Sequence, residues 1–133
     1  VDTLLAHAVD AIIVSNTTLA RPGLEHEPLA REAGGLSGRP LFAPSTRMLA
    51  KGYVVTGGRV PLIGVGGIDS GETALQKIEA GASLIQLYTG LVYQGPGLVG
   101  RMKAALLTAI ESAGASSLHD ITGRAAADWA ERS

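Results

Sequence analysis

Two glycine-bearing segments each follow a run of apolar residues and precede a helical pattern. They are GVGGI at residues 64–68 and LYTG at residues 87–90. Glycine has no Cβ, so the backbone N–H groups of such segments can approach an oxyanion closely. In parallel α/β barrels, the loops after the last two strands often hold a phosphate with backbone amides and helix N-termini. We therefore predict one phosphate site shared by the two segments, without a cluster of Lys or Arg.

The composition is that of an ordinary folded domain with little net charge. The chain has 133 residues, 46% of them hydrophobic, and a net charge of -1, which gives no electrostatic reason to expect nucleic acid or an anionic membrane as partner. No apolar run reaches the roughly 18 to 20 residues of a membrane span. The lack of cysteine excludes disulfides and thiolate ligands and fits a reducing cytosol. The three histidines are isolated, so we expect no metal site.

Strand and helix patterns alternate three times along the chain. Apolar runs predict three strands, the first of a kind that is covered on both faces, at residues 11–14, 60–65 and 83–88. Helical spacing predicts three helices, at about residues 44–56, 69–80 and 98–113. Such alternation implies parallel strands joined by right-handed crossovers.

The connections carry further signals. Asp69 and Glu72 have the spacing of a capping box that opens the second helix. Residues 17–41 are polar and rich in glycine and proline, and this length is unusual for a connection inside a compact domain, so we interpret them as a lid. After about residue 114 the pattern predicts a short helix or a docked arm, with Trp129 packed on the helical layer.

Three βα units do not close a barrel. A complete (β/α)8 barrel needs eight strands and about 250 residues, and an open three-stranded sheet exposes its edge strands to solvent. We therefore expect an α/β fold that comprises the C-terminal three βα units of a (β/α)8 TIM barrel, which is a partial barrel. Such a chain is either a C-terminal fragment or one that must pair with something to bury its edges.

Four motifs then occur in order and at linked spacings. They are SNTT at residues 15–18, GGLSGRPL at 34–41, IGVGGI at 63–68 and QLYTG at 86–90, the last followed by Gly95-Pro96. Together they closely resemble the C-terminal part of the quinone-dependent, class 2 dihydroorotate dehydrogenases, over about residues 1–112. The resemblance implies that residues 1–114 are the C-terminal part of an FMN-binding barrel and that residues 115–133 form a tail.

The resemblance also implies an activity. Enzymes of this family oxidise dihydroorotate to orotate in the biosynthesis of pyrimidines (UMP), with FMN as cofactor and a quinone as electron acceptor. They are cytoplasmic and peripheral to the inner membrane, which they meet through an N-terminal segment that precedes the first residue here. By position, the resemblance assigns two residues to the substrate, Asn16 and Thr17. It assigns five residues to FMN, with Gly66 as a further candidate beside the phosphate: Ser15, Gly38, Gly67, Tyr88 and Thr89.

The residue types agree with these assignments. The pair Gly66-Gly67 leaves room for an oxyanion, and a helix that begins near Asp69 adds the positive end of its dipole. Asn16 offers both a donor and an acceptor, as a pyrimidine edge requires. Taken alone, however, Gly66-Gly67 is equally a tight turn, Asn16 is equally a cap, and Tyr93 is either beside the flavin or in the core.

The resemblance assigns no catalytic residue to this chain. The family's serine base, a lysine near the flavin and a cluster of substrate-binding asparagines all belong to segments before residue 1, and neither Ser37 nor Ser45 lies in the context of that base. We therefore expect that the chain alone neither oxidises dihydroorotate nor holds FMN tightly, because hydride transfer needs a positioned base as well as the cofactor.

Two other functions remain open from the sequence. One is that of another phosphate-binding TIM-barrel enzyme, such as a different flavin oxidoreductase or an isomerase of a phosphorylated metabolite. The other is that of a non-catalytic chain that self-associates through its strand edges.

Overall fold

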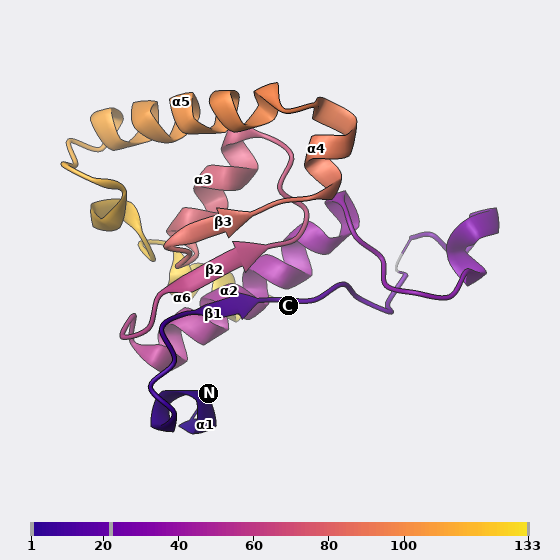
Figure 1. Cartoon of the computed structure of the whole chain (residues 1–133), viewed down its shortest axis with the longest axis horizontal. Coiled ribbons are helices and arrows are strands. Elements are labelled where there is room, and N and C mark those ends of the chain that lie inside the picture. The colour runs from indigo at the N-terminus through magenta and orange to yellow at the C-terminus, as the bar shows by residue number, and fades with distance from the viewer. Residues whose placement is uncertain (1, 22, 133) are drawn as a thin grey trace.

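The computed structural model describes residues 2–21 and 23–132. Val1, the first residue of the expected barrel part (1–114), and Ser133, the last residue of the expected tail (115–133), therefore lie outside the described residues. At its centre is a parallel sheet of three strands in the order β1-β2-β3. The strands are β1 (Ile12–Val14), β2 (Leu62–Val65) and β3 (Leu84–Gln86). Ile63 pairs with Ile13 on one side and with Leu84 on the other. The predicted parallel alternation is confirmed (Figure 1).

Helices follow each strand, and a short helix precedes the first. The helices of the βα units are α2 (Phe42–Thr56), α3 (Gly71–Glu79), α4 (Thr89–Gln94) and α5 (Gly97–Ser112), and the one before β1 is α1 (Asp2–Ala6). The helix α2 begins two residues before the predicted start at Pro44. It ends as predicted at Gly57, whose φ of 61° is the left-handed conformation of a C-cap. The helix α4 lies in a segment that the sequence predicted as loop.

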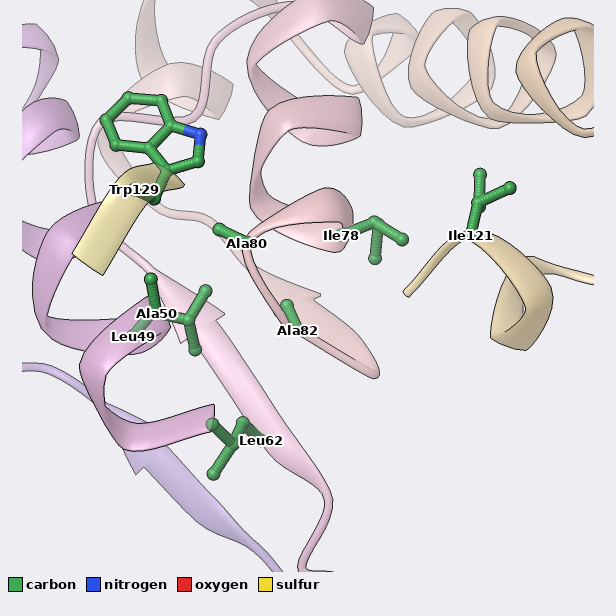
Figure 2. Packing of buried hydrophobic residues seen from close by; sticks show 8 residues of the cluster. All are labelled: Leu49, Ala50, Leu62, Ile78, Ala80, Ala82, Ile121 and Trp129. Carbon is green, nitrogen blue, oxygen red and sulfur yellow. The ribbon is translucent and has the colours of Figure 1, made fainter. Parts of the chain in front are cut away.

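The main core lies between the sheet and its helices. Leu49 of α2 and Ile78 of α3 pack with Leu62 of β2, all of them buried. Figure 2 shows Leu49 near β2, which carries Leu62, and Ile78 pointing from α3 toward Ile121. Ile12 and Val14 of β1 pack against the same cluster from the sheet. The βα units are therefore held together by the helix-facing side of the sheet.

The opposite face of the sheet is open, which corrects the expectation for residues 11–14. Ile13 is 58% exposed and Leu84 is 62% exposed, whereas Leu62 on the helix-facing side is 1% exposed. Right-handed crossovers between neighbouring parallel strands place successive helices on the same face of the sheet. Three units therefore cover one face only, and the strand β1 is not covered on both faces as we predicted.

The residues after 114 dock onto the helical layer, which agrees with a short helix or docked arm. A 3-10 turn (Leu118–Ile121) is followed by α6 (Ala126–Glu131), which packs against α2. The Trp129 ring is buried, and its centroid lies 6.0 Å from that of Phe42 in an edge-to-face arrangement at 85°.

The long connection after β1 reaches away from the sheet before it returns to α2 (Figure 1). It contains two 3-10 turns, Pro28–Arg31 and Arg39–Leu41, and one isolated antiparallel bridge between Thr18 and Leu36. Among the helices of the described residues, none has the length and apolar character needed to cross a membrane.

Candidate functional site

A cavity of about 1310 Å³ opens at the carboxyl ends of the three strands. Ligands of parallel α/β folds bind at this end of the sheet. All eight residues that the sequence predicted for FMN or substrate line this one cavity: Ser15, Asn16, Thr17, Gly38, Gly66, Gly67, Tyr88 and Thr89. The structure thus brings together residues from three separate loops.

The turn after β2 forms the middle of the cavity wall. Gly66 and Gly67 have φ angles of 105° and 73°, a region that side-chain-bearing residues rarely adopt. A Cβ on Gly67 would lie 2.4 Å from the Cα of Phe42, so the turn packs directly on the start of α2. Among the described residues, the N–H groups of both glycines are absent from the hydrogen bonds of turns, loops and caps.

The end of β3 lies against this turn. Tyr88 is the N-cap of α4 and Thr89 is its first residue, and the first N–H groups of a helix have no partner within it. A Cβ on Gly90 would lie 2.4 Å from the carbonyl oxygen of Ile68, so the two loops are in direct contact. The amides after β2 and those after β3 therefore belong to one continuous surface.

The returning end of the long connection closes the third side. The Thr89 hydroxyl donates to Ser37 Oγ at 3.0 Å. Gly38 has a φ of 75°, and a Cβ there would lie 3.3 Å from Thr89 Cγ2. Gly38 is thus held beside the end of β3, within the cavity lining.

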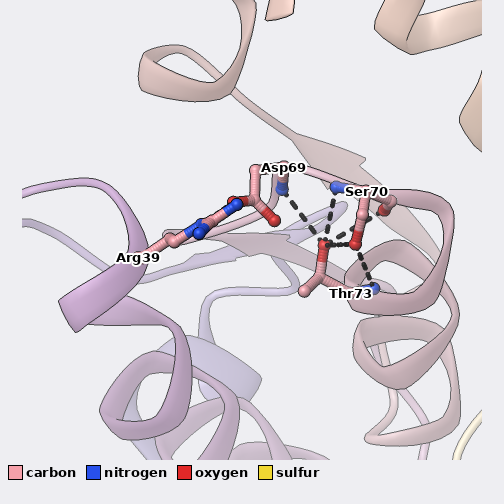
Figure 3. A network of polar contacts seen from close by, with 4 residues as sticks. All are labelled: Arg39, Asp69, Ser70 and Thr73. Carbon is pink, nitrogen blue, oxygen red and sulfur yellow. Dashed lines mark hydrogen bonds and ion pairs between the residues drawn. The ribbon is translucent and has the colours of Figure 1, made fainter. Parts of the chain in front are cut away.

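The capping box of α3 differs from the prediction by one residue. Ser70, not Asp69, is the N-cap, and its hydroxyl accepts from the Thr73 N–H at 3.1 Å while Thr73 Oγ1 accepts from the Ser70 N–H at 3.0 Å. Asp69 instead accepts a hydrogen bond from Arg39 Nε across the cavity rim, and this ion pair raises the pKa of Arg39 (Figure 3). The predicted partner Glu72 takes no part in the cap, because Thr73 occupies the reciprocal position.

Asn16 lies exposed at the end of β1, next to Ser15 and Thr17. Its Oδ1 accepts from the Thr17 N–H at 2.8 Å. A carbonyl oxygen has two lone pairs and the amide group two N–H donors, so Asn16 retains capacity for a ligand with both donors and acceptors. The side chain is also held in place by its own loop.

The charges at the cavity are few and largely engaged. Arg21 donates to the carbonyl oxygens of Thr18 and Gly34, at 2.9 and 2.6 Å, and so braces the long connection.

Tyr93 lines the cavity, and 82% of its surface is exposed. Of the two alternatives for Tyr93, beside the flavin or in the core, the core position is therefore wrong. Within the described residues, no group of His, Asp and Glu could hold a metal ion.

One polar contact beneath the cavity was not anticipated. Lys77 of α3 is fully buried and its Nζ donates to Ser45 Oγ at 2.7 Å. Burial lowers the pKa of Lys77 to about 7. A signal for it was present, because Lys77 lies three residues after the buried Ala74, on the inward stripe of an amphipathic helix.

Fold and cavity together define a parallel βα layer with one cavity at the carboxyl ends of its strands. A family model described as dihydroorotate dehydrogenase matches residues 1–110, and the chain belongs to that family. A relative in Brucella ovis, named dihydroorotate dehydrogenase (quinone), is 55% identical over 96% of the chain, and one in Brucella melitensis is 54% identical. The chain spans 35% of the length of these relatives.

Solved structures agree with this assignment. A crystal structure of DHODH from Eimeria tenella in complex with ferulenol superposes with a TM-score of 0.85 at 41% identity, over 92% of this chain and 33% of the other. A ligand-free DHODH structure from the same organism superposes with the same TM-score, and the present chain covers 34% of its length. The predicted fold class, three βα units of a (β/α)8 barrel, is confirmed.

Proposed function

We propose that this chain forms the FMN-phosphate side and part of the dihydroorotate side of a quinone-dependent dihydroorotate dehydrogenase. The observation that carries the proposal is the single cavity in which loops from all three strand ends meet. The whole enzyme oxidises dihydroorotate to orotate in pyrimidine biosynthesis and passes the electrons to a quinone. Family membership favours this function over that of another phosphate-binding barrel.

The residues at the cavity fit the phosphate end of FMN. The N–H groups of Gly66 and Gly67, with those of Tyr88 and Thr89, supply backbone donors beside the start of α2 and need no lysine. The chemistry that FMN supplies when bound is acceptance of the two electrons removed from dihydroorotate. Ser15 and Gly38 line the same cavity on the other two loops and are assigned to the rest of the cofactor.

Asn16 and Thr17 are assigned to the substrate. The Asn16 amide would pair with the donor and acceptor groups on one edge of the dihydroorotate ring, and the Thr17 hydroxyl would add a third polar contact. The base that removes the proton is assigned to the part of the relatives' length that this chain does not span. The same holds for the quinone site and for the segment that brings the enzyme to the membrane.

Self-association is a second property that we propose for the isolated chain. It is favoured by the open face of the sheet, where Ile13 and Leu84 are both more than half exposed. In the whole barrel, the missing strands would cover this face and pair with the edges of β1 and β3.

Exchange of segments tests the enzymatic proposal. The matching part of the Brucella ovis relative is replaced by this chain, and dihydroorotate-dependent quinone reduction is measured. We expect an FMN-loaded, active hybrid, whereas the 133-residue chain alone shows no turnover. A folded hybrid without FMN or without turnover would refute the proposal.

Two variants of the hybrid sharpen the test. Asn16→Ala should lower kcat/KM by about ten- to hundredfold, because it removes hydrogen bonds to the substrate. His26→Ala is the matched control, since His26 is exposed on the same connection and lies outside the cavity lining. It should leave turnover unchanged.

A further inference from the structure

A buried polar chain runs beneath the Gly66-Gly67 turn. Lys77 Nζ donates to Ser45 Oγ at 2.7 Å, and Ser45 Oγ lies 3.1 Å from the carbonyl oxygen of Gly66 and 3.1 Å from that of Phe42. Lys77 is fully buried and Ser45 is 2% exposed. These hydrogen bonds therefore join α3, the first turn of α2 and the turn after β2.

The direction of these hydrogen bonds follows from the groups involved. The Lys77 amino group keeps N–H donors in both its charged and its neutral form, and in the structure it donates to Ser45 Oγ, so the single hydroxyl hydrogen of Ser45 is left for the two carbonyl groups. Lys77 thus orients the serine hydroxyl toward the Gly66 and Phe42 carbonyl oxygens. Those carbonyl groups belong to the segments that press together where a Cβ on Gly67 would collide with Phe42.

A serine beside a lysine of lowered pKa has the composition of a nucleophile and its base. The surroundings exclude that role, because Ser45 and Lys77 are sealed in the layer between sheet and helices and neither lines the cavity. With Ser45 only 2% exposed, no substrate could reach its Oγ without a change in the packing around it. The pair acts on structure, not on a bond of the substrate.

Burial of a lysine is unfavourable, and here its only compensations among the described contacts are Ser45 and the Phe42 ring, whose centroid lies 5.1 Å from Nζ. An apolar side chain of similar length would fill the same space without that penalty. We infer that Lys77 is a positioning residue which, through Ser45, holds the Gly66-Gly67 turn in the geometry that receives the FMN phosphate. The identity of that ligand rests on the proposed function.

The first test needs no ligand. Backbone order parameters of Gly66 and Gly67 are measured by ¹⁵N relaxation in the wild-type chain, in Lys77→Met and in Ser45→Ala. We expect the values to fall from about 0.85 toward 0.6 or lower in both variants. Thr56→Val is the control, since Thr56 is a buried hydroxyl of the same helix that bonds only the Tyr53 carbonyl oxygen.

The second test measures the affinity of the wild-type chain and of its variants for FMN and for riboflavin, which lacks the phosphate. We expect Lys77→Met and Ser45→Ala each to weaken FMN binding by about tenfold while riboflavin binding is unchanged. Tenfold corresponds to about 1.4 kcal/mol, which lies within the net contribution of one hydrogen bond. The double variant should lose no more FMN affinity than either single variant, since both substitutions interrupt the same set of hydrogen bonds. The double variant also removes both buried polar groups together, so the experiment stays decisive if a single variant leaves one of them without a partner and does not fold.

The outcomes are separable. If the turn stays ordered and the FMN affinity stays unchanged in the folded variants, the positioning role of Lys77 is refuted. If the wild-type chain does not prefer FMN over riboflavin, the proposed function fails, and the order parameters alone then decide whether Lys77 holds the turn.

Discussion

Gly66 and Gly67 combine left-handed backbone angles with close neighbours, and both features exclude a side chain. At Gly67 the φ of 73° would strain any L-residue, and a Cβ would also lie 2.5 Å from the Phe42 nitrogen. The contact is with backbone atoms, which cannot rotate away. The turn therefore keeps its place against α2 only while both positions remain glycine.

Replacement of Gly67 by alanine should destabilise the fold. We expect Gly67→Ala to lower the free energy of unfolding by about 2 kcal/mol or more, from strain and steric overlap. The control is Gly100→Ala, in the middle of α5 with no atom within 4 Å of the added Cβ, which should raise stability by about 0.5 to 1 kcal/mol. Urea unfolding measures both, and equal effects of the two substitutions would contradict the packing described for the turn.

Lys77 should make stability depend on pH. Its pKa is about 7 in the fold, whereas an unperturbed lysine has a pKa of 10.5. Between these values the unfolded chain binds a proton that the folded chain does not. The free energy of unfolding then rises with pH, by up to about 1.4 kcal/mol per unit. This contribution is complete above pH 10.5 and is lost as the pH falls toward 7.

Comparison with Lys77→Met isolates that dependence. Between about pH 7 and 9, the wild-type chain should gain up to about 2.7 kcal/mol relative to the variant, because all other titrating groups are shared. Urea midpoints at the two pH values give the difference. Parallel pH profiles of the two proteins would show that Lys77 is not buried as the structure has it.

The start of α3 is fixed by its capping box, and the Asp69 ion pair contributes separately at the cavity rim. Ser70→Ala should cost about 1 kcal/mol of stability, because it removes the side-chain acceptor for the Thr73 N–H. Asp69→Asn should change stability by well under about 1 kcal/mol, since Arg39 is 80% exposed in that ion pair. Thermal unfolding of both variants separates the two positions. A larger loss of stability for Asp69→Asn than for Ser70→Ala would indicate that Asp69 is the cap of α3.

Most elements were predictable because their signals are local. The strands follow from continuous apolar runs, and Gly57 marks the end of α2 by its own conformation. The cap of α3 could not be predicted, because Asp69 and Ser70 are both good N-cap residues. In the structure Ser70 forms the cap, and Asp69 pairs with Arg39, thirty residues away in sequence. The six-residue helix α4 was missed because it begins Thr89-Gly90 and carries no side-chain cap.

The candidate site shows the same division. Seven of the eight predicted residues follow strand ends, and parallel strands bring their carboxyl ends together, so their meeting in one cavity could be predicted from the motifs. Gly38 instead belongs to the returning end of the long connection, and its place was predicted only from the resemblance. The contact of Lys77 with Ser45 joins positions 32 residues apart, and a lysine in an amphipathic helix usually lies at the surface. The place of Lys77 on the inward stripe of α3 was the one local signal of its burial, and only the packing of α3 on α2 reveals its contact with Ser45.

At the scale of the whole molecule, the helices cover one face of the sheet and leave the other to solvent. We expect the isolated chain to self-associate, and size-exclusion chromatography should give an apparent mass above that of a monomer that rises with concentration. The double variant Ile13→Lys with Leu84→Lys should elute as a monomer, because it places charges on the open face. The control is Leu107→Lys on α5, which is 56% exposed and lies away from the sheet. A wild-type chain that remains monomeric at every concentration would contradict this expectation.

The central claim is that backbone amides after β2 and β3 together hold the FMN phosphate. An NMR titration of the ¹⁵N-labelled chain with FMN, and in parallel with riboflavin, tests it most directly. We predict that the amide resonances of Gly66, Gly67 and Thr89 shift together along one saturation curve with FMN and shift little with riboflavin. Equal shifts with both ligands, or FMN-dependent shifts confined to only one of the two loops, would contradict the account.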